Sequence, residues 1–561
     1  MLPLGRRLNS AGGVRAFSTA LRRPLAPLRT VSTLPSLRRS SGLAAGQRDP
    51  AELDQITRLP NGLRVATEAL PGHFAAVGVY VEGGSRFEPP ELSGCSHIMD
   101  RLAFKSTKTR SIDDMQGVLQ EMGGTYMCSS SREAVMYQAA AFNQDIERMT
   151  EVLADTIINP QITEDEVETQ KLTAEYEIEQ IWGKPDMILP ELAHMAAFRD
   201  NTLGNALLCP AERLPLINSD VMKQYRNAFY QPERTVVAFA GVAHEEALRI
   251  VERHFGDWKS ATPGESAVST GTLDGIFKSL FAGSGGQPPL ISTPAHYTGG
   301  SIVLPTTAKV PDYTHCFIAF EGLPISDPDV YALAVLQLII GSGSSFSAGG
   351  PGKGMFARAF TKVLNRYRWI DSFMSFNHSY SDSGLFGVSA SVEHRAANVV
   401  AEVICQELAL TMHSGAGGIT QLEVDNAKRQ LRSSLLMNLE SRMIQVEDLG
   451  RQVQVHGRKV GVQEMCESIS ALSVDDITRV AQRVMKGAVV NVGEGSGRPT
   501  VVLHGPNVEN IGDVFACCDK YGLGRGAPDK GYTRGGKQHF TPSKISYNPI
   551  FLLSYLPQEV L

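Results

Sequence analysis

The sequence predicts an α+β fold with two homologous domains, each a mixed sheet packed with helices, which together enclose a cavity. Strand-like and helix-like patterns alternate without the strict βαβ rhythm of a doubly wound sheet. The 561 residues are too many for one hydrophobic core. An acid-capped helix followed by a Val-rich strand is predicted at 218–241 and again at 474–495, an offset of about 256 residues. This internal similarity indicates a duplicated domain.

Residues 1–48 differ in composition from the rest of the chain. They contain nine Arg, six Ser and no acidic residue. This composition, without a long apolar run, is typical of a mitochondrial presequence, and Arg15-Ala16-Phe17-Ser18 suggests removal after Phe17. The alternative is a basic tail that binds nucleic acid.

The charge of the remaining chain favours a cationic partner over nucleic acid. With 53 basic and 59 acidic residues, the net charge is −6. Removal of residues 1–17 lowers it to −9, and removal of 1–48 lowers it to −15, because only Arg residues are lost. The apolar runs are about half the ~20 residues that a membrane span requires. The eight cysteines show no CxxC spacing, which favours free thiols.

The N-terminal peptidase-like domain is predicted over 49–262. Asn61-Gly62 separates two strand-like runs and indicates a hairpin. A strand is expected over 74–85, where valines alternate, and another over 134–141. Ser111 and Asp114 begin a helix as a capping box, and Gly123 ends it. A second helix carries an apolar stripe of Ile146, Met149, Leu153 and Ile157.

The second half repeats this organisation. A Gly/Ser/Pro-rich linker is predicted over 263–297, and the C-terminal domain over 298–515. That domain begins with a strand, a polar turn and an apolar helix in 314–341. Residues 516–561 show little periodicity and are expected to form a tail.

The turn "CSHIMDR" (95–101) carries the residues most suggestive of chemistry. His97, Asp100 and Arg101 project towards one side of a helix. They occupy the positions of an inverted zinc motif, H-x-x-E-H, but Arg101 stands where the second His would be. Because arginine stays protonated and has no lone pair for a metal, we expect no metal in this chain and no catalytic residue here. The other acidic His-containing segment, at 244–246, is expected on a solvated helix face.

The stretch "GSGSSFSAGGPGKGMF" (341–356) is the second distinctive feature, with six Gly and four Ser. It lacks the Gly five residues before Gly352 and the Ser/Thr after Lys353 that a phosphate-binding loop requires. Two interpretations of this stretch stay possible, a flexible connector and a peptide-binding loop. The candidate loop residues are Gly341, Gly343, Ser344, Ser345, Phe346, Gly349, Gly350, Gly352, Lys353 and Gly354.

These two stretches resemble the mitochondrial processing peptidase family, whose pitrilysin-like fold has two α+β domains. Its catalytic beta subunit reads H-x-x-E-H-x-x-F-K-x-T where this chain reads "HIMDRLAFKST". In the family a third ligand, a Glu, follows the second His by about 76 residues, and Glu177 lies 76 residues after Arg101. The resemblance identifies His97, Asp100, Arg101 and Glu177 as remnants of a degenerate zinc site. We expect Arg101 to pair with Asp100 or Glu177.

The resemblance implies a non-catalytic subunit. A degraded motif and a glycine-rich loop mark the alpha subunit, which is implicated in binding presequences for cleavage by the zinc-bearing beta subunit. The implied partners are that beta subunit, in a heterodimer, and cationic presequence peptides, in the mitochondrial matrix and without nucleic acid. The acid-rich segment 164–179 suits such substrates, although a solvated helix face explains most of its carboxylates. The alternatives are a core subunit of the cytochrome bc1 complex, which shares the fold, and a self-sufficient zinc peptidase, against which Arg101 argues.

Overall fold

The computed structural model describes residues 54–260, 275–276, 278–282, 290–306, 313–344 and 355–525. These residues all belong to one unit, Asp49–Leu561. The predicted presequence lies outside the described residues, as does most of the glycine-rich loop: Ser345, Phe346, Gly349, Gly350, Gly352, Lys353 and Gly354.

The first sheet has six strands in the order β1-β2-β6-β3-β5-β4. Its strands are β1 (Asp54–Arg58), β2 (Arg64–Glu68), β3 (Phe74–Val81), β4 (Thr125–Ser130), β5 (Val135–Phe142) and β6 (Thr235–Ala240). All neighbours are antiparallel except β2 and β6. The helices of this half are α2 (Cys95–Arg101), α3 (Ile112–Met122), α4 (Ile146–Ile158), α5 (Glu164–Trp182), α6 (Pro185–Ala197), α7 (Ser219–Phe229) and α8 (His244–Phe255).

The local signals in this half are confirmed. β1 and β2 form the expected hairpin around Asn61-Gly62. Ser111 caps α3 with a full capping box, and Gly123 ends the helix in the left-handed conformation. The predicted stripe of α4 is buried against β3 and β5. These features depend on residues close in sequence, which is why the pattern alone predicts them.

The second sheet also has six strands, in the order β7-β12-β8-β11-β10-β9. Its strands are β7 (Gly300–Pro305), β8 (Tyr313–Gly322), β9 (Ser342–Ser344), β10 (Ile370–Ser379), β11 (Gly384–Glu393) and β12 (Thr500–Gly505). The helices of this half are α10 (Val330–Ile340), α11 (Ala397–Thr411), α12 (Gln421–Asn438), α13 (Arg442–His456), α14 (Val462–Ala471), α15 (Val474–Met485) and α16 (Val514–Lys520).

The two sheets share one topology, which confirms the duplicated α+β fold. In order across the sheet, β2, β6, β3, β5 and β4 correspond to β7, β12, β8, β11 and β10, with the same parallel pair at the start. α4 follows β5 just as α11 follows the equivalent strand β11. Likewise, α7 precedes β6 and α15 precedes β12. Sheet 1 adds β1 at one edge, whereas sheet 2 adds β9 at the other.

One predicted strand is wrong. The Val-rich run after α15 was expected to match β6, but residues 486–499 form no strand and the equivalent strand is β12. Val490 and Val492 are 77% and 75% exposed, so their apolar character does not reflect a core. The four glycines between 487 and 497 instead form a loop that packs closely, with Gly495 against Glu321.

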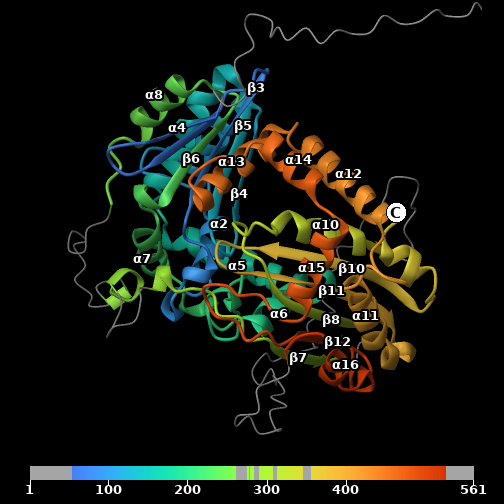
Figure 1. Ribbon diagram of the computed structural model, residues 1–561. Coiled ribbons are helices and arrows are strands. Elements are labelled where there is room, and N and C mark those ends of the chain that lie inside the picture. Colours follow the sequence, from blue (N-terminus) through green and yellow to red (C-terminus); the bar gives the residue numbers. More distant parts are fainter. Residues whose placement is uncertain are drawn as a thin grey trace, which may run out of the picture. The chain divides into compact units, whose positions relative to one another are not determined.

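Each half also contributes a helix to the sheet of the other half. α13, from the second half, covers the face of sheet 1 opposite α4, where Val446, Leu449 and Val453 pack on Tyr80 and Ala238. α6, from the first half, packs in the same way on β7, β8 and β12. Figure 1 shows α13 beside β6 and α6 beside β8. The two domains are therefore interlocked and do not have separate cores on these faces.

Two predicted domain boundaries, the end of the linker and the start of the tail, fall within packed parts of the structure. Ala295 and Tyr297, at the end of the predicted linker, are fully buried against α6. The predicted start of the tail at residue 516 falls inside α16, and Cys518 and Leu523 belong to the core of the second half. Among the described residues, no helix combines the length and apolar character needed to cross a membrane.

Candidate functional site

Helix α2, which carries the "CSHIMDR" turn, is fixed at its N-terminal end by a buried carboxylate. Glu88 accepts hydrogen bonds from the backbone N–H groups of Gly94 (2.8 Å) and Ser96 (2.6 Å). These are donors that a helix start leaves unpaired. Gly94 itself has φ +86°, and a Cβ there would lie 2.5 Å from the Cys209 sulfur. The short helix is therefore held against the segment around Cys209.

His97 is buried, and both of its ring nitrogens are hydrogen-bonded. Nδ1 faces the backbone N–H of Cys209 at 3.2 Å, and Nε2 lies 3.0 Å from Oε2 of Glu177. Because Nδ1 accepts a hydrogen bond, the ring proton belongs on Nε2, which donates to Glu177. Burial lowers the pKa of His97, although Glu177 opposes this effect. His97 is thus a neutral interior histidine near pH 7.

Arg101 joins the two carboxylates of the cluster. Its Nε donates to Oε2 of Glu177 at 3.0 Å, and Nη1 donates to Oδ1 of Asp100 at 3.2 Å. The expected pairing with Asp100 or Glu177 is therefore seen with both. Arg101 and Glu177 are each about one-third exposed, so this arrangement lies at the edge of solvent. The guanidinium places a fixed positive charge beside Oε2 of Glu177.

Asp100 is held by a neighbouring strand. Its Oδ2 accepts from the backbone N–H of Ser130 at 2.8 Å, at the end of β4. Burial raises the pKa of Asp100, while Arg101 and the Ser130 bonds lower it. The sequence offered no sign of the contacts with Ser130 or with Cys209, because those residues lie 30 and 112 positions away.

The residues that follow α2 form a loop that is hydrogen-bonded to α4. Phe104 adopts φ +60°, and its N–H donates to Thr156 Oγ1 at 2.9 Å. The Thr107 hydroxyl donates to Asp155 at 2.6 Å. The F-K-x-T part of the motif therefore anchors the helix end to α4.

The described part of the glycine-rich loop is anchored at both ends. At its start, Ser342–Ser344 forms β9 and pairs with β10, an edge strand that the sequence did not predict. Gly341 has φ +76°, and a Cβ there would lie 2.2 Å from that of Ala357. After the loop, the buried Arg358 donates to Glu423 at 2.9 Å and to the Gly417 carbonyl at 3.1 Å. Of the predicted loop residues, Gly341, Gly343 and Ser344 are described.

Most carboxylates of the acid-rich α5 have structural roles. Glu166 completes the capping box with Thr163 and accepts from Ser106. Glu164 accepts from the Ser219 N–H, and Glu168 pairs with Lys171 at 2.7 Å. Glu175 and Glu179 are exposed, and neither has a partner within the described part of the chain. These two carboxylates are free to attract a cation.

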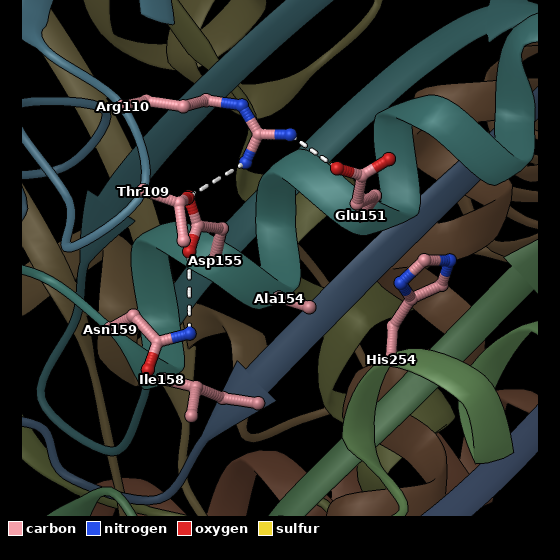
Figure 2. A pocket seen from close by; sticks show the side chains of 8 residues that line it. All are labelled: Thr109, Arg110, Glu151, Ala154, Asp155, Ile158, Asn159 and His254. Atoms are coloured by element: carbon pink, nitrogen blue, oxygen red, sulfur yellow. Dashed lines mark hydrogen bonds and ion pairs between the residues drawn. The ribbon is translucent and has the colours of Figure 1, made fainter.

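A surface pocket of about 300 Å³ lies elsewhere, between the end of the α2 loop, α4 and α8 (Figure 2). Arg110 points into it and pairs with Glu151 and with Asp155, the latter at 2.7 Å. Because Arg110 is paired with two carboxylates of α4, these ion pairs fasten the loop after α2 to that helix. Within the described ranges, no three His, Cys, Asp or Glu side chains are arranged so that they could hold a metal ion.

Two family models match the chain between residues 64 and 431. The family model described as "Insulinase (Peptidase family M16)" matches residues 64–211, and "Peptidase M16 inactive domain" matches 217–431. Mitochondrial-processing peptidase subunit alpha of Neurospora crassa is 50% identical over 514 residues, covering 83% of this chain and 89% of the relative. The same subunit of Homo sapiens is 35% identical, with 80% and 83% covered, and that of Caenorhabditis elegans is 34% identical, with 82% and 88% covered. The chain therefore belongs to the insulinase family of peptidases, family M16, together with these alpha subunits.

Proposed function

We propose that this chain is the non-catalytic, substrate-recognition subunit of the mitochondrial processing peptidase. It binds the presequences of imported precursors in the mitochondrial matrix and presents them to a zinc-bearing beta subunit, its partner in a heterodimer. The similarity to alpha subunits over most of the chain supports this assignment.

The Arg101 cluster carries the non-catalytic part of the proposal. Zinc requires lone pairs from neutral nitrogens or carboxylates. Arg101 offers none, and the Nε2–H group of His97 donates a hydrogen bond to Glu177, so Nε2 has no lone pair for a metal. Zinc bound at Nε2 would require the ring proton on Nδ1, where it would face the Cys209 N–H. The donor set does not fit zinc, and the metal is expected in the beta subunit alone.

Substrate recognition is assigned to acidic surface and to the glycine-rich loop 341–354. Presequences are cationic and amphipathic, so their receptor needs carboxylates beside apolar side chains. On α5, the unpaired Glu175 and Glu179 flank Leu172 and Tyr176, which are 68% and 62% exposed. The loop supplies backbone groups without bulky side chains, and the anchors at β9 and Arg358 fix where it leaves and rejoins the domain.

A reconstitution experiment tests the proposal. Cleavage of a precursor is measured with this chain alone, with a beta subunit alone, and with the two mixed. We expect cleavage only in the mixture, and metal analysis of this chain alone should find well below one zinc per chain. Cleavage by this chain alone, or one tightly bound zinc in it, would support the self-sufficient peptidase and overturn the assignment.

The alternative is a structural core subunit associated with the cytochrome bc1 complex, which shares the fold. The long glycine-rich loop favours the processing subunit, because it resembles the loop that marks the alpha subunit. Purification of the native protein separates the two: co-purification with cytochromes and no stimulation of cleavage would favour the core subunit.

A further inference from the structure

Three cysteines lie where α16, the last helix in the described part of the chain, packs on α11. The sulfur atoms of Cys405 on α11 and Cys518 on α16 are 3.8 Å apart, close to van der Waals contact. Cys517 directly precedes Cys518 on α16, so its backbone lies beside this contact. Two helices separated by more than 100 residues in sequence thus bring three free thiol groups into one region.

The three thiols differ in their access to solvent. Cys405 and Cys518 are fully buried, whereas Cys517 is partly exposed. The Cys517 sulfur lies 3.6 Å from Oε2 of Glu402, and Lys520 donates to the other carboxylate oxygen of Glu402 at 2.6 Å. A small oxidant can therefore reach Cys517 first, because the other two thiols are buried.

We propose that this cluster is an oxidation site at which hydrogen peroxide links α11 to α16 through an intrachain disulfide. The Cys517 sulfur attacks one peroxide oxygen and becomes a sulfenic acid, and water leaves. The Cys405 sulfur then attacks the Cys517 sulfur, forms the S–S bond and releases a second water. Two thiols lose two electrons and two protons, and one peroxide becomes two waters. Exchange with Cys518 can then move the bond to the Cys405–Cys518 pair.

The surroundings make this site slow and selective. Burial raises the pKa of the Cys517 thiol, and the Glu402 carboxylate adds to this effect, so little thiolate is present near pH 7. The Lys520 ammonium, at the end of α16, and the hydroxyl of the next residue, Tyr521, also face Glu402. The thiols therefore stay reduced without an oxidant. Once a sulfenic acid forms, the adjacent Cys405 reacts with it before a second peroxide does.

The bond would have a structural consequence. Between Cys405 and Cys518, which are 113 positions apart, it would close a long loop and fasten the last described helix to the core of the second half. Cross-links that close long loops restrict the unfolded chain and raise its free energy. Oxidised protein should therefore unfold at a higher temperature than reduced protein, and a reductant should reverse the change.

The full-length protein is treated with hydrogen peroxide, alkylated, digested with trypsin and analysed by mass spectrometry. We expect peptides 396–428 and 487–520 to be joined, with the remaining cysteine of 487–520 alkylated and a mass otherwise lower by two hydrogens than the sum of the two. C405S should abolish this product, and C517S should slow it by about tenfold or more, because the buried thiols meet peroxide poorly. C466S is the control, since Cys466 is also partly exposed but lies on α14, and it should change neither outcome.

Several results would contradict the proposal. Cys517 could be oxidised to sulfinic acid with no cross-link, or the cross-link could join two copies of the chain. The joined peptides could also form as fast in C517S as in the unaltered protein. Thermal unfolding of each reduced variant shows whether the substitution itself disturbs the fold. A variant that unfolds like the parent before oxidation makes any missing cross-link attributable to chemistry.

Discussion

The ring of Tyr80 on β3 lies directly against Gly450 on α13, so the two domains meet there with no side chain between ring and helix. A Cβ added to Gly450 would lie 2.0 Å from Cε2 of Tyr80. The Tyr80 hydroxyl donates to the Val446 carbonyl at 2.7 Å, and Gln138 donates to it in turn. This contact locks the second half's helix onto the first half's sheet.

Gly450→Val should destabilise the protein by roughly 1–3 kcal/mol, because the larger side chain forces the Tyr80 ring or α13 to move. Urea unfolding measures the change. Gly117→Ala is the matched control, since Gly117 also lies in a helix but its Cβ would meet nothing within 4 Å. That substitution should be neutral or stabilise by up to about 1 kcal/mol. Equal losses in the two variants would contradict the close approach.

Arg101→Met should raise the pKa of His97. The guanidinium lowers this pKa, whereas the Glu177 carboxylate, which the substitution leaves in place, raises it. The titration of His97 can be followed by NMR. Lys171→Met, which breaks the ion pair with Glu168 on the same helix, is the control and should leave the pKa unchanged. Stability should change by less than about 1 kcal/mol, because the Arg101 pairs are partly exposed. An unmoved His97 titration would show that the arginine does not act on it.

Glu321→Gln should remove a pH dependence of stability. Burial raises the pKa of Glu321 to about 7, from an ordinary value of 4.5. Between these values the unfolded chain releases a proton that the folded protein retains, so stability falls as pH rises from 4.5 to 7. Below this window the carboxyl is protonated in both states and costs nothing. The loss should reach roughly 3 kcal/mol and stay constant above pH 7.

The Gln variant fits the site because Glu321 Oε1 accepts from Asn491 at 2.7 Å, and the amide retains that acceptor. Urea unfolding from pH 4.5 to 8 should give a flatter profile for Glu321→Gln than for the parent. Glu509→Gln, which alters an exposed carboxylate in the same half, should leave the profile unchanged. A parent profile that rises across the window would mean that Glu321 is ionised in the folded protein.

Deletion of residues 345–354 should impair precursor cleavage by the reconstituted complex without preventing assembly. The anchors at β9 and Arg358 flank the deletion and are retained. Steady-state kinetics and size-exclusion chromatography measure the two properties. A deletion of equal length within the predicted linker, 263–272, is the control and should retain cleavage. If both deletions behave alike, the loop has no specific role.

Local signals in the sequence predicted a large part of this fold. The hairpin at Asn61-Gly62, the Ser111 capping box and the apolar stripe of α4 each depend on residues within a few positions of one another. The strand placed after α15 failed, because valines at 490 and 492 look like core residues but are exposed. A pattern of apolar residues does not reveal which of two nearby segments joins the sheet.

The candidate site was predictable only in its residues. The resemblance to the processing peptidase family identified Glu177 as part of the cluster, and the structure brings His97, Asp100, Arg101 and Glu177 together. The tautomer of His97 was not predictable, because it depends on a backbone N–H at Cys209, 112 residues away. Backbone donors carry no sequence signature.

The exchanged helices also set an order of events during synthesis. Sheet 1 is complete once β6 has emerged, but the α13 segment that covers one of its faces lies about 200 residues later. At 5–20 residues per second, that apolar face waits roughly 10–40 s for its cover. During that interval the nascent protein exposes Tyr80, Val236 and Ala238, residues that are fully buried at the end. A chaperone that shields this face should therefore matter more for the first half of the chain than for the second. The helix that covers the second sheet, α6, is synthesised before that sheet.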